Sequence, residues 1–164
     1  MKLLLRMLSW SSSPLLCCSL GVAQATWIVS FDGSGDFRTI PQAEAAASPG
    51  DRIVVAVASF GALGDLVTSK GISVLIGGNG AQPFDVHVSN LPAGQQFSLS
   101  QMRGPVSTSF DMSFTDCAGE VFVDGAAMIG LPHPTIRVER CAFVSLNGCQ
   151  GPALTVIDLS LIHI

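Results

Sequence analysis

Two segments of this sequence each place a charged residue directly before a cysteine, an acidic residue in one and a basic residue in the other. Asp116-Cys117 is followed further along by Arg140-Cys141, so a repeat of that length would bring the carboxylate beside the guanidinium and one thiol beside the other. A carboxylate facing an arginine across neighbouring repeats is an ion pair, and exposed ion pairs contribute only about 0–1 kcal/mol to stability. The spacing therefore predicts a structural contact between Asp116 and Arg140 rather than a catalytic pair.

The cysteines allow two arrangements. Three cysteines lie beyond residue 25: Cys117, Cys141 and Cys149. They permit either one disulfide with a leftover thiol or three buried thiols. Cys117 and Cys141 can be bridged if their Cα atoms approach within about 7 Å, which strands stacked about 4.8 Å apart permit. No C-x-x-C pair occurs, and His87 and His133 have no ligand-like spacing to the cysteines. The sequence therefore predicts no zinc site, and no cofactor is expected.

A second matched pair consists of Asp124-Gly125 and Asn147-Gly148, which occupy equivalent places in the same repeat. Aspartate and asparagine tolerate tight turns and bond to their own backbone, so this pair predicts a stacked ladder of turns rather than a binding site. Carbohydrate grooves generally present aromatic faces. Beyond residue 25 the chain has Trp27, no tyrosine, and phenylalanines mainly at expected core positions, which argues against sugar stacking on this segment.

Recurring strands must position these pairs. One series of apolar-alternating segments centres on positions 75, 99, 123 and 146, and a second comprises residues 86–91, 112–117 and 136–141. Each unit of about 24 residues is too small to bury its own apolar face, and stacking the units solves that problem. The sequence therefore predicts an all-β fold, a right-handed parallel β-helix or solenoid. An antiparallel sandwich is the alternative, but it would need hairpin turns roughly every 8–12 residues and leaves the recurrence unexplained.

The solenoid is expected to begin with a turn and a helix. The turn Asp32–Asp36 is rich in glycine and aspartate, which favours tight backbone bends. A short capping helix is predicted over Ile40 to Ala47, because Thr39 and Gln42 have the spacing of a capping box and the alanines favour helix. The following apolar run, Arg52–Val57, is predicted to be the first buried strand of the solenoid.

Residues 1–25 have the features of a secretory signal peptide. Lys2 and Arg6 give a positive start, residues 15–22 form a short apolar run, and residues 23–25 are small enough for cleavage. The apolar run is shorter than the roughly 20 residues of a membrane span. Cleavage removes two positive charges and no acid from a chain whose formal charge is −4, which excludes nucleic acid as an expected partner. We expect a secreted, surface-displayed or periplasmic protein whose partners are polysaccharides or cell-surface components.

The end of the chain, residues 159–164, matches the in-frame translation of a transposase adapter used in sequencing libraries. We interpret this segment as an assembly artefact, so residues 26–158 are expected to be the N-terminal coils of a longer β-helix that is truncated here. The alternative is an ordinary apolar final strand.

The entry segment resembles the opening of pectin methylesterases and related pectin-lyase-like β-helix proteins. The likeness covers about residues 27–80 and rests on Asp32-Gly33-Ser34-Gly35-Asp36-Phe37-Arg38-Thr39-Ile40, on the alanines at 43–47, on Ser48-Pro49-Gly50-Asp51-Arg52-Ile53-Val54-Val55 and on the later Ser69–Gly77. In those families the early helix covers the first coil, which implies the same role for Ile40 to Ala47. The usual Gly-x-Tyr after the first strand is replaced here by Ser59-Phe60-Gly61.

The resemblance implies an esterase or lyase only where catalytic residues match. Esterases of this family use two aspartates and an arginine, one carboxylate attacking and the other transferring protons. The available groups, none within a family catalytic motif, are Asp111, Asp116, Asp124, Arg137 and Arg140.

A lyase would need a basic residue and clustered acids that hold calcium. Lys70 is the one lysine beyond residue 25, and no dense acidic cluster accompanies it, so a solvated side chain is expected. The sequence thus predicts no catalytic, cofactor or metal residue. It favours a non-catalytic secreted β-solenoid over the alternative, the N-terminal fragment of a polysaccharide-acting enzyme whose catalytic coils lie beyond Asp158.

Overall fold

The computed structural model describes residues 23–56, 62–77, 84–101, 111–125, 135–149, 153–158 and 162–163. Within these ranges, seven strands form sheet A: β1 (Thr26–Val29), β2 (Arg52–Ala56), β4 (Ser73–Gly77), β6 (Gln96–Gln101), β8 (Glu120–Asp124), β10 (Phe143–Asn147) and β12 (Ile162–His163). Five strands form sheet B: β3 (Leu66–Thr68), β5 (Val86–Ser89), β7 (Met112–Thr115), β9 (Thr135–Glu139) and β11 (Ala153–Ile157). The helix α1 spans Ile40–Ala46.

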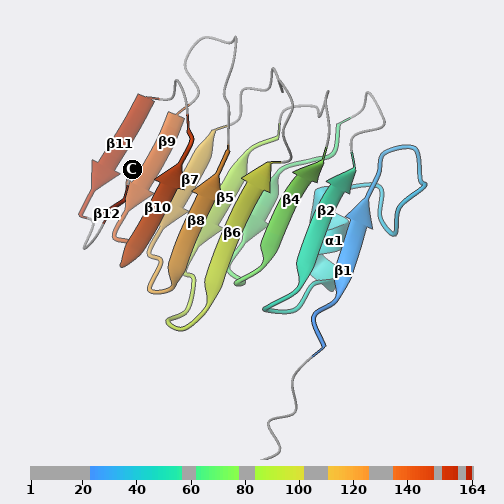
Figure 1. Ribbon diagram of the computed structural model, residues 1–164, viewed down its shortest axis with the longest axis horizontal. Coiled ribbons are helices and arrows are strands. Elements are labelled where there is room, and N and C mark those ends of the chain that lie inside the picture. The colour runs from blue at the N-terminus through green and yellow to red at the C-terminus, as the bar shows by residue number, and fades with distance from the viewer. Residues whose placement is uncertain are drawn as a thin grey trace, which may run out of the picture.

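From β2 onward the chain alternates between the sheets, so strands that are neighbours within a sheet belong to successive coils (Figure 1). All strand pairings within the described ranges are parallel. This arrangement is a parallel β-solenoid, and it confirms the predicted fold class.

The two predicted series of strands correspond to the two sheets, with one correction of register. The sequence aligned Leu75 with Leu99, whereas in the structure Leu99 pairs with Val74, so this coil is longer than predicted by a single position. The next two steps agree with the prediction, because Leu99 pairs with Val123 and Val123 with Leu146. The short strand β3 and the strand β11 were not part of either series.

The core lies between the two sheets. Inward side chains stack from coil to coil as rows of aliphatic residues, for example Ile53, Val74, Leu99, Val123 and Leu146 in sheet A. Phe97 from sheet A and Phe114 from sheet B meet across the core with ring centroids 6.3 Å apart. Burial of each such side chain contributes about 1.5–3 kcal/mol, so the row pattern supplies most of the driving force for stacking.

Helix α1 covers the first coils, as the resemblance implied. Its Ile40 and Ala43 side chains are fully buried, and it packs beside β1, β2 and β3. Thr39 occupies the N-cap position, but its hydroxyl makes no capping hydrogen bond. The predicted capping box is therefore wrong, although the predicted helix is present.

Lys70 was expected to be solvated, and the structure corrects this. Its ammonium group donates to the carbonyl oxygens of Glu44 and Ala47 at 2.7 and 3.1 Å and lies 3.3 Å from the Glu44 carboxylate. These carbonyls lie at the C-terminal end of α1, where partial negative charge gathers and a cation is favourable. Lys70 therefore links the C-terminal end of α1 to the turn that precedes β4 by hydrogen bonds and an ion pair.

Asp51 joins the beginning of the described chain to the first coil. Its carboxylate accepts hydrogen bonds from the backbone N–H groups of Ala25 and Ser48 at 2.8 and 2.9 Å, and from the Trp27 indole at 3.3 Å. The side chain is buried. The bonds from Ser48 and Ala25 lower the pKa of Asp51, and burial opposes them only in part.

Some predictions concern segments outside the described residues. These are the greater part of the signal peptide, His133, and the Ser59–Gly61 departure from the family pattern. The short strand β12 pairs with β10 and falls within residues 159–164, whose adapter origin remains a prediction. Among the residues that the structure describes, no helix is long and apolar enough to traverse a lipid bilayer.

Replacing Asp51 by asparagine tests its role as a junction. The amide keeps the size of the side chain but turns one acceptor into a donor that faces other donors, so we expect a loss of about 1–3 kcal/mol in the free energy of unfolding. Urea titration followed by circular dichroism measures this loss. Glu120→Gln, an equal change of charge at an exposed position of sheet A, should change stability by less than about 0.5 kcal/mol.

The wild type and Asp51→Asn also give a pH test. Because the pKa of Asp51 is lower in the folded chain, its contribution is complete above the unfolded-state pKa of about 3.9 and is lost as pH falls through the lower folded value. The stability difference between the wild type and Asp51→Asn should therefore shrink as pH falls below about 4. A difference that stays constant throughout the acid range would contradict the assignment.

Candidate functional site

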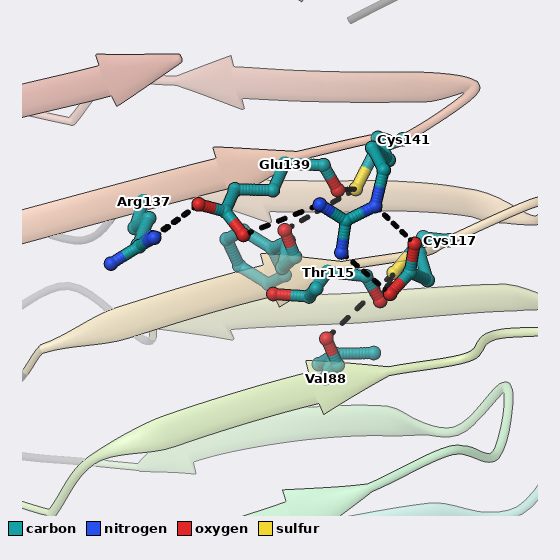
Figure 2. A network of polar contacts seen from close by, with 9 residues as sticks. Val88, Thr115, Cys117, Arg137, Glu139 and Cys141 are labelled. Atoms are coloured by element: carbon teal, nitrogen blue, oxygen red, sulfur yellow. Dashed lines mark hydrogen bonds and ion pairs between the residues drawn. The ribbon is translucent and has the colours of Figure 1, made fainter. Parts of the chain in front are cut away.

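The short turns after β7 and β9 bring together two pairs that the sequence singled out, Asp116 with Arg140 and Cys117 with Cys141. Figure 2 shows the two cysteines within this network of polar contacts. Thr115 pairs with Glu139, so the next residues, Asp116 and Arg140, are level with each other. Both have left-handed backbone, with φ of 55° and 48°. The Asp116 N–H donates to the Glu139 carbonyl, and the Arg140 N–H donates to the Ile157 carbonyl, both at 3.0 Å and both in the following coil. Closely similar backbone bends thus place the two side chains on one edge of the solenoid.

Asp116 and Arg140 form the predicted ion pair. The guanidinium donates through Nε and Nη2 to the two carboxylate oxygens at 2.6 and 2.9 Å, and Glu139 lies 3.8 Å from Nη1. The hydrogen bond from Arg140 lowers the pKa of Asp116, and the same bond raises the pKa of Arg140. Both side chains are about half exposed, so the pair orders the turn but adds little stability.

Cys117 and Cys141 lie directly behind the ion pair, on the core side. Both are buried thiols rather than a disulfide. The Cys117 sulfur lies 3.8 and 3.6 Å from the carbonyl oxygens of Val88 and Thr115, and the Cys141 sulfur 3.4 and 3.2 Å from those of Phe114 and Glu139, so each S–H has two acceptors within reach. The predicted stacking of the two cysteines is confirmed.

The two thiols influence each other's titration. The hydrogen-bonding contact with Cys141 raises the pKa of Cys117, and burial adds to this effect. The same contact lowers the pKa of Cys141, against the opposing effect of burial. Cys149 differs from both because it is partly exposed, with its sulfur 3.9 Å from the Asn147 carbonyl, so the alternative of three buried thiols is wrong.

A shallow hollow of about 400 Å³ opens over this cluster. Its lining residues are Asp116, Cys117, Ala118, Arg140, Cys141, Ala142 and Asp158. The Asp116 carboxylate is occupied by the arginine and the sulfurs face backbone carbonyls, so neither group is poised to take a proton from a nucleophile.

The remaining acids and the second arginine are dispersed. Asp111 precedes β7 and accepts the backbone N–H and the hydroxyl of Thr135, at 2.8 and 2.9 Å. Asp124 ends β8 and accepts from the Asn147 amide at 3.1 Å, which confirms the predicted ladder of turns. Arg137 donates to the carboxylate of Glu139 on its own strand. Asp111, Asp124 and Arg137 therefore do not join Asp116 and Arg140, and the hollow over the thiols adds only Asp158 to that pair.

Asp111 belongs to a ladder of aspartates at the start of the strands of sheet B. The Asp65 carboxylate accepts the N–H of Asp85 at 3.1 Å, and the Asp85 carboxylate accepts the N–H of Asp111 at 3.0 Å. Each of these carboxylates thus bonds to the equivalent residue one coil later. No group of three or more histidine, cysteine or acidic side chains within the described ranges is arranged to hold a metal ion.

Sequence reasoning missed a histidine–serine contact on the outer face of sheet B. His87 Nδ1 lies 2.7 Å from the Ser113 hydroxyl, and the two residues are register partners on β5 and β7. The signal was available, since His87 and Ser113 occupy equivalent places in the second series of strands. On an open sheet face this contact is a cross-strand pair.

A polar strip on sheet A was also missed. Four polar residues and two aliphatic ones line a depression of about 180 Å³ on the outer face of β2, β4 and β6: Arg52, Ser73, Ser98 and Ser100 with Val74 and Leu75. The Ser98 hydroxyl donates to that of Ser73 at 2.9 Å. Ser73 also lines a larger hollow of about 410 Å³, which extends to Gln24, Gln95 and Gln96 and to the turns between them. Because Ser73 belongs to both, the two hollows adjoin. We call them together the sheet A groove.

Comparison of the chain with protein-family models, curated proteins and solved structures found no match in any of the three. The stacked parallel strands define the chain as a β-solenoid protein.

The exposure of the ion pair leads to a prediction. Asp116→Asn and Arg140→Gln should each destabilise the protein less than Asp51→Asn, and the double variant should show coupling between them that fades in 1 M salt, where charges are screened within about 3 Å. Urea titrations at low and high salt measure both effects. Coupling that persists undiminished in high salt would show that the pair is more than a screened surface contact.

Proposed function

We propose that this chain forms part of a secreted or surface-displayed β-solenoid that binds a polysaccharide along the sheet A groove without cleaving it. The supporting observation is that two adjoining hollows cross the coils of β2, β4 and β6, one on the outer face of sheet A and the other over the turns that precede its strands. Each coil is held to the next by parallel backbone pairing. The groove is therefore preorganised for an extended chain rather than for a compact ligand.

The lining chemistry favours a polymer rich in hydroxyl groups. Serine hydroxyls and glutamine carboxamides both donate and accept hydrogen bonds, as sugar hydroxyls do. The residues that line the groove include no aromatic side chain on which a sugar could stack, so binding would rest on hydrogen bonds and on one charge. Arg52 is that charge, since it is exposed at the rim beside Ser73. A guanidinium pairs well with a carboxylate, which favours a polysaccharide that contains uronic acids.

The location that we infer rests on the N-terminal segment, whose positive start, short apolar run and small residues resemble a signal peptide. The likeness of the entry segment to pectin-lyase-like proteins agrees with both the location and the ligand. In the hollow over the thiols the Asp116 carboxylate is held in an ion pair by Arg140 rather than left open to attack a substrate, which favours binding over catalysis.

Binding to polygalacturonate, with a neutral β-glucan for comparison, tests the proposal. Arg52→Gln should weaken binding of polygalacturonate roughly tenfold, because it removes a charge-assisted hydrogen bond. It should leave binding of the neutral glucan unchanged. Arg137→Gln is the matched control, since it makes the same change on sheet B, where Arg137 is exposed and bonds to Glu139.

Two results would defeat the proposal. If Arg137→Gln weakens polygalacturonate binding as much as Arg52→Gln, the attraction is general charge and not the groove. If neither polysaccharide binds, the groove is not a polysaccharide site. Methanol release from methyl-esterified pectin, or formation of unsaturated uronates, would instead support the enzymatic alternative.

A further inference from the structure

The stacked thiols behind the ion pair have a geometry that the polysaccharide groove does not use. Cys117 and Cys141 follow shortly after register-paired residues of β7 and β9. Ala142 N–H donates to the Cys117 carbonyl at 2.8 Å, which continues the pairing between coils through the turn. Neighbouring strands lie about 4.8 Å apart, and disulfides span Cα separations of about 4.4–6.8 Å. The two backbones are thus already at bridging distance.

The thiols also point into the same space. Both cysteines are buried, and each is close enough to alter the pKa of the other. The hollow of about 400 Å³ is lined by both cysteines and gives a small molecule a short approach to them. We propose that Cys117 and Cys141 are an oxidation site at which a small hydroperoxide closes a disulfide between two successive coils.

The chemistry divides into two steps. Cys141 attacks first, because the neighbouring thiol lowers its pKa and the thiolate is the nucleophile. Its thiolate attacks one oxygen of hydrogen peroxide, the O–O bond breaks, and Cys141 becomes a sulfenic acid while hydroxide leaves and takes up a proton. The Cys117 sulfur then attacks the Cys141 sulfur, the S–O bond breaks, and water leaves with the Cys117 proton. Two thiols and one peroxide yield one disulfide and two waters.

The third thiol provides the internal control. Cys149 follows β10, whereas Cys141 precedes that strand, so the length of β10 separates the two. Cys149 is partly exposed, so it is the thiol of the three that an indiscriminate oxidant would meet first. Selective linkage of the two buried cysteines would therefore reflect their stacking and not their accessibility.

The experiment treats the full reduced chain with one equivalent of hydrogen peroxide under native conditions and maps the products by mass spectrometry after trypsin digestion. No lysine or arginine follows Arg140, so Cys141 and Cys149 share one tryptic peptide, whereas Cys117 lies in another. The Cys149→Ser variant removes this ambiguity. We expect it to give the linked peptides in unchanged yield, with a mass about 2 Da below that of the two thiols.

Two further readouts separate this proposal from a structural role for the cysteines. Cys117→Ser should abolish the link and leave a sulfenic acid on Cys141 that dimedone traps. The oxidised wild type should unfold several degrees above the reduced form, and dithiothreitol should reverse the shift. Circular dichroism confirms that each variant is folded.

The proposal is overturned if Cys149 forms the link, if Cys117 and Cys141 are oxidised separately, or if peroxide leaves both unchanged. It is equally overturned if the link forms only in denaturant, since that would show that the native stack forbids it.

Discussion

Register between coils is the constraint on which the rest of this molecule depends. Each coil bonds to its neighbours along both sheets, so its backbone pairing and its apolar row are satisfied together or not at all. A slip by a single position would turn inward side chains such as Leu99 toward solvent. The polar side chains on the edges reinforce the same register, because Asp116 meets Arg140, and Asp124 meets Asn147, only when the coils are aligned. Stability and specificity therefore have a common origin here.

Much of this order could be predicted because it is periodic. The second series of strands, and the matches between positions 116 and 140 and between 117 and 141, agree with sheet B and its turns. The error in the first series is local: Leu75 was taken as the centre of β4, but the buried residues of that strand are Val74 and Ile76, and Val74 is the partner of Leu99. Strand β3, over Leu66–Thr68, is too short for alternation to be recognised.

Contacts between non-equivalent residues could not be predicted in this way. Lys70 reaches the end of α1, and Asp51 joins Ala25 to Ser48, through folding in three dimensions rather than through the repeat. The sheet A groove escaped notice for another reason: each coil contributes only a few residues to it, and no single segment carries a motif. The thiol stack was visible in the spacing. Its burial, and the contrast with the partly exposed Cys149, required the structure.

The left-handed bends on the short-turn edge have a consequence for how such a chain can grow. Asn90, Asp116, Arg140 and Asp158 share nearly one backbone conformation, with φ between 48° and 55°. A segment copied from one bend to the next begins and ends with the same geometry, so a duplication of that length would splice in a complete coil with matching ends. Such bends are natural breakpoints for expansion or for designed extension. Asparagine and aspartate suit them best, because other residues with a side chain lose about 1–2 kcal/mol there. Arg140 is the costly exception, and an engineered copy without the ion pair should carry asparagine in its place.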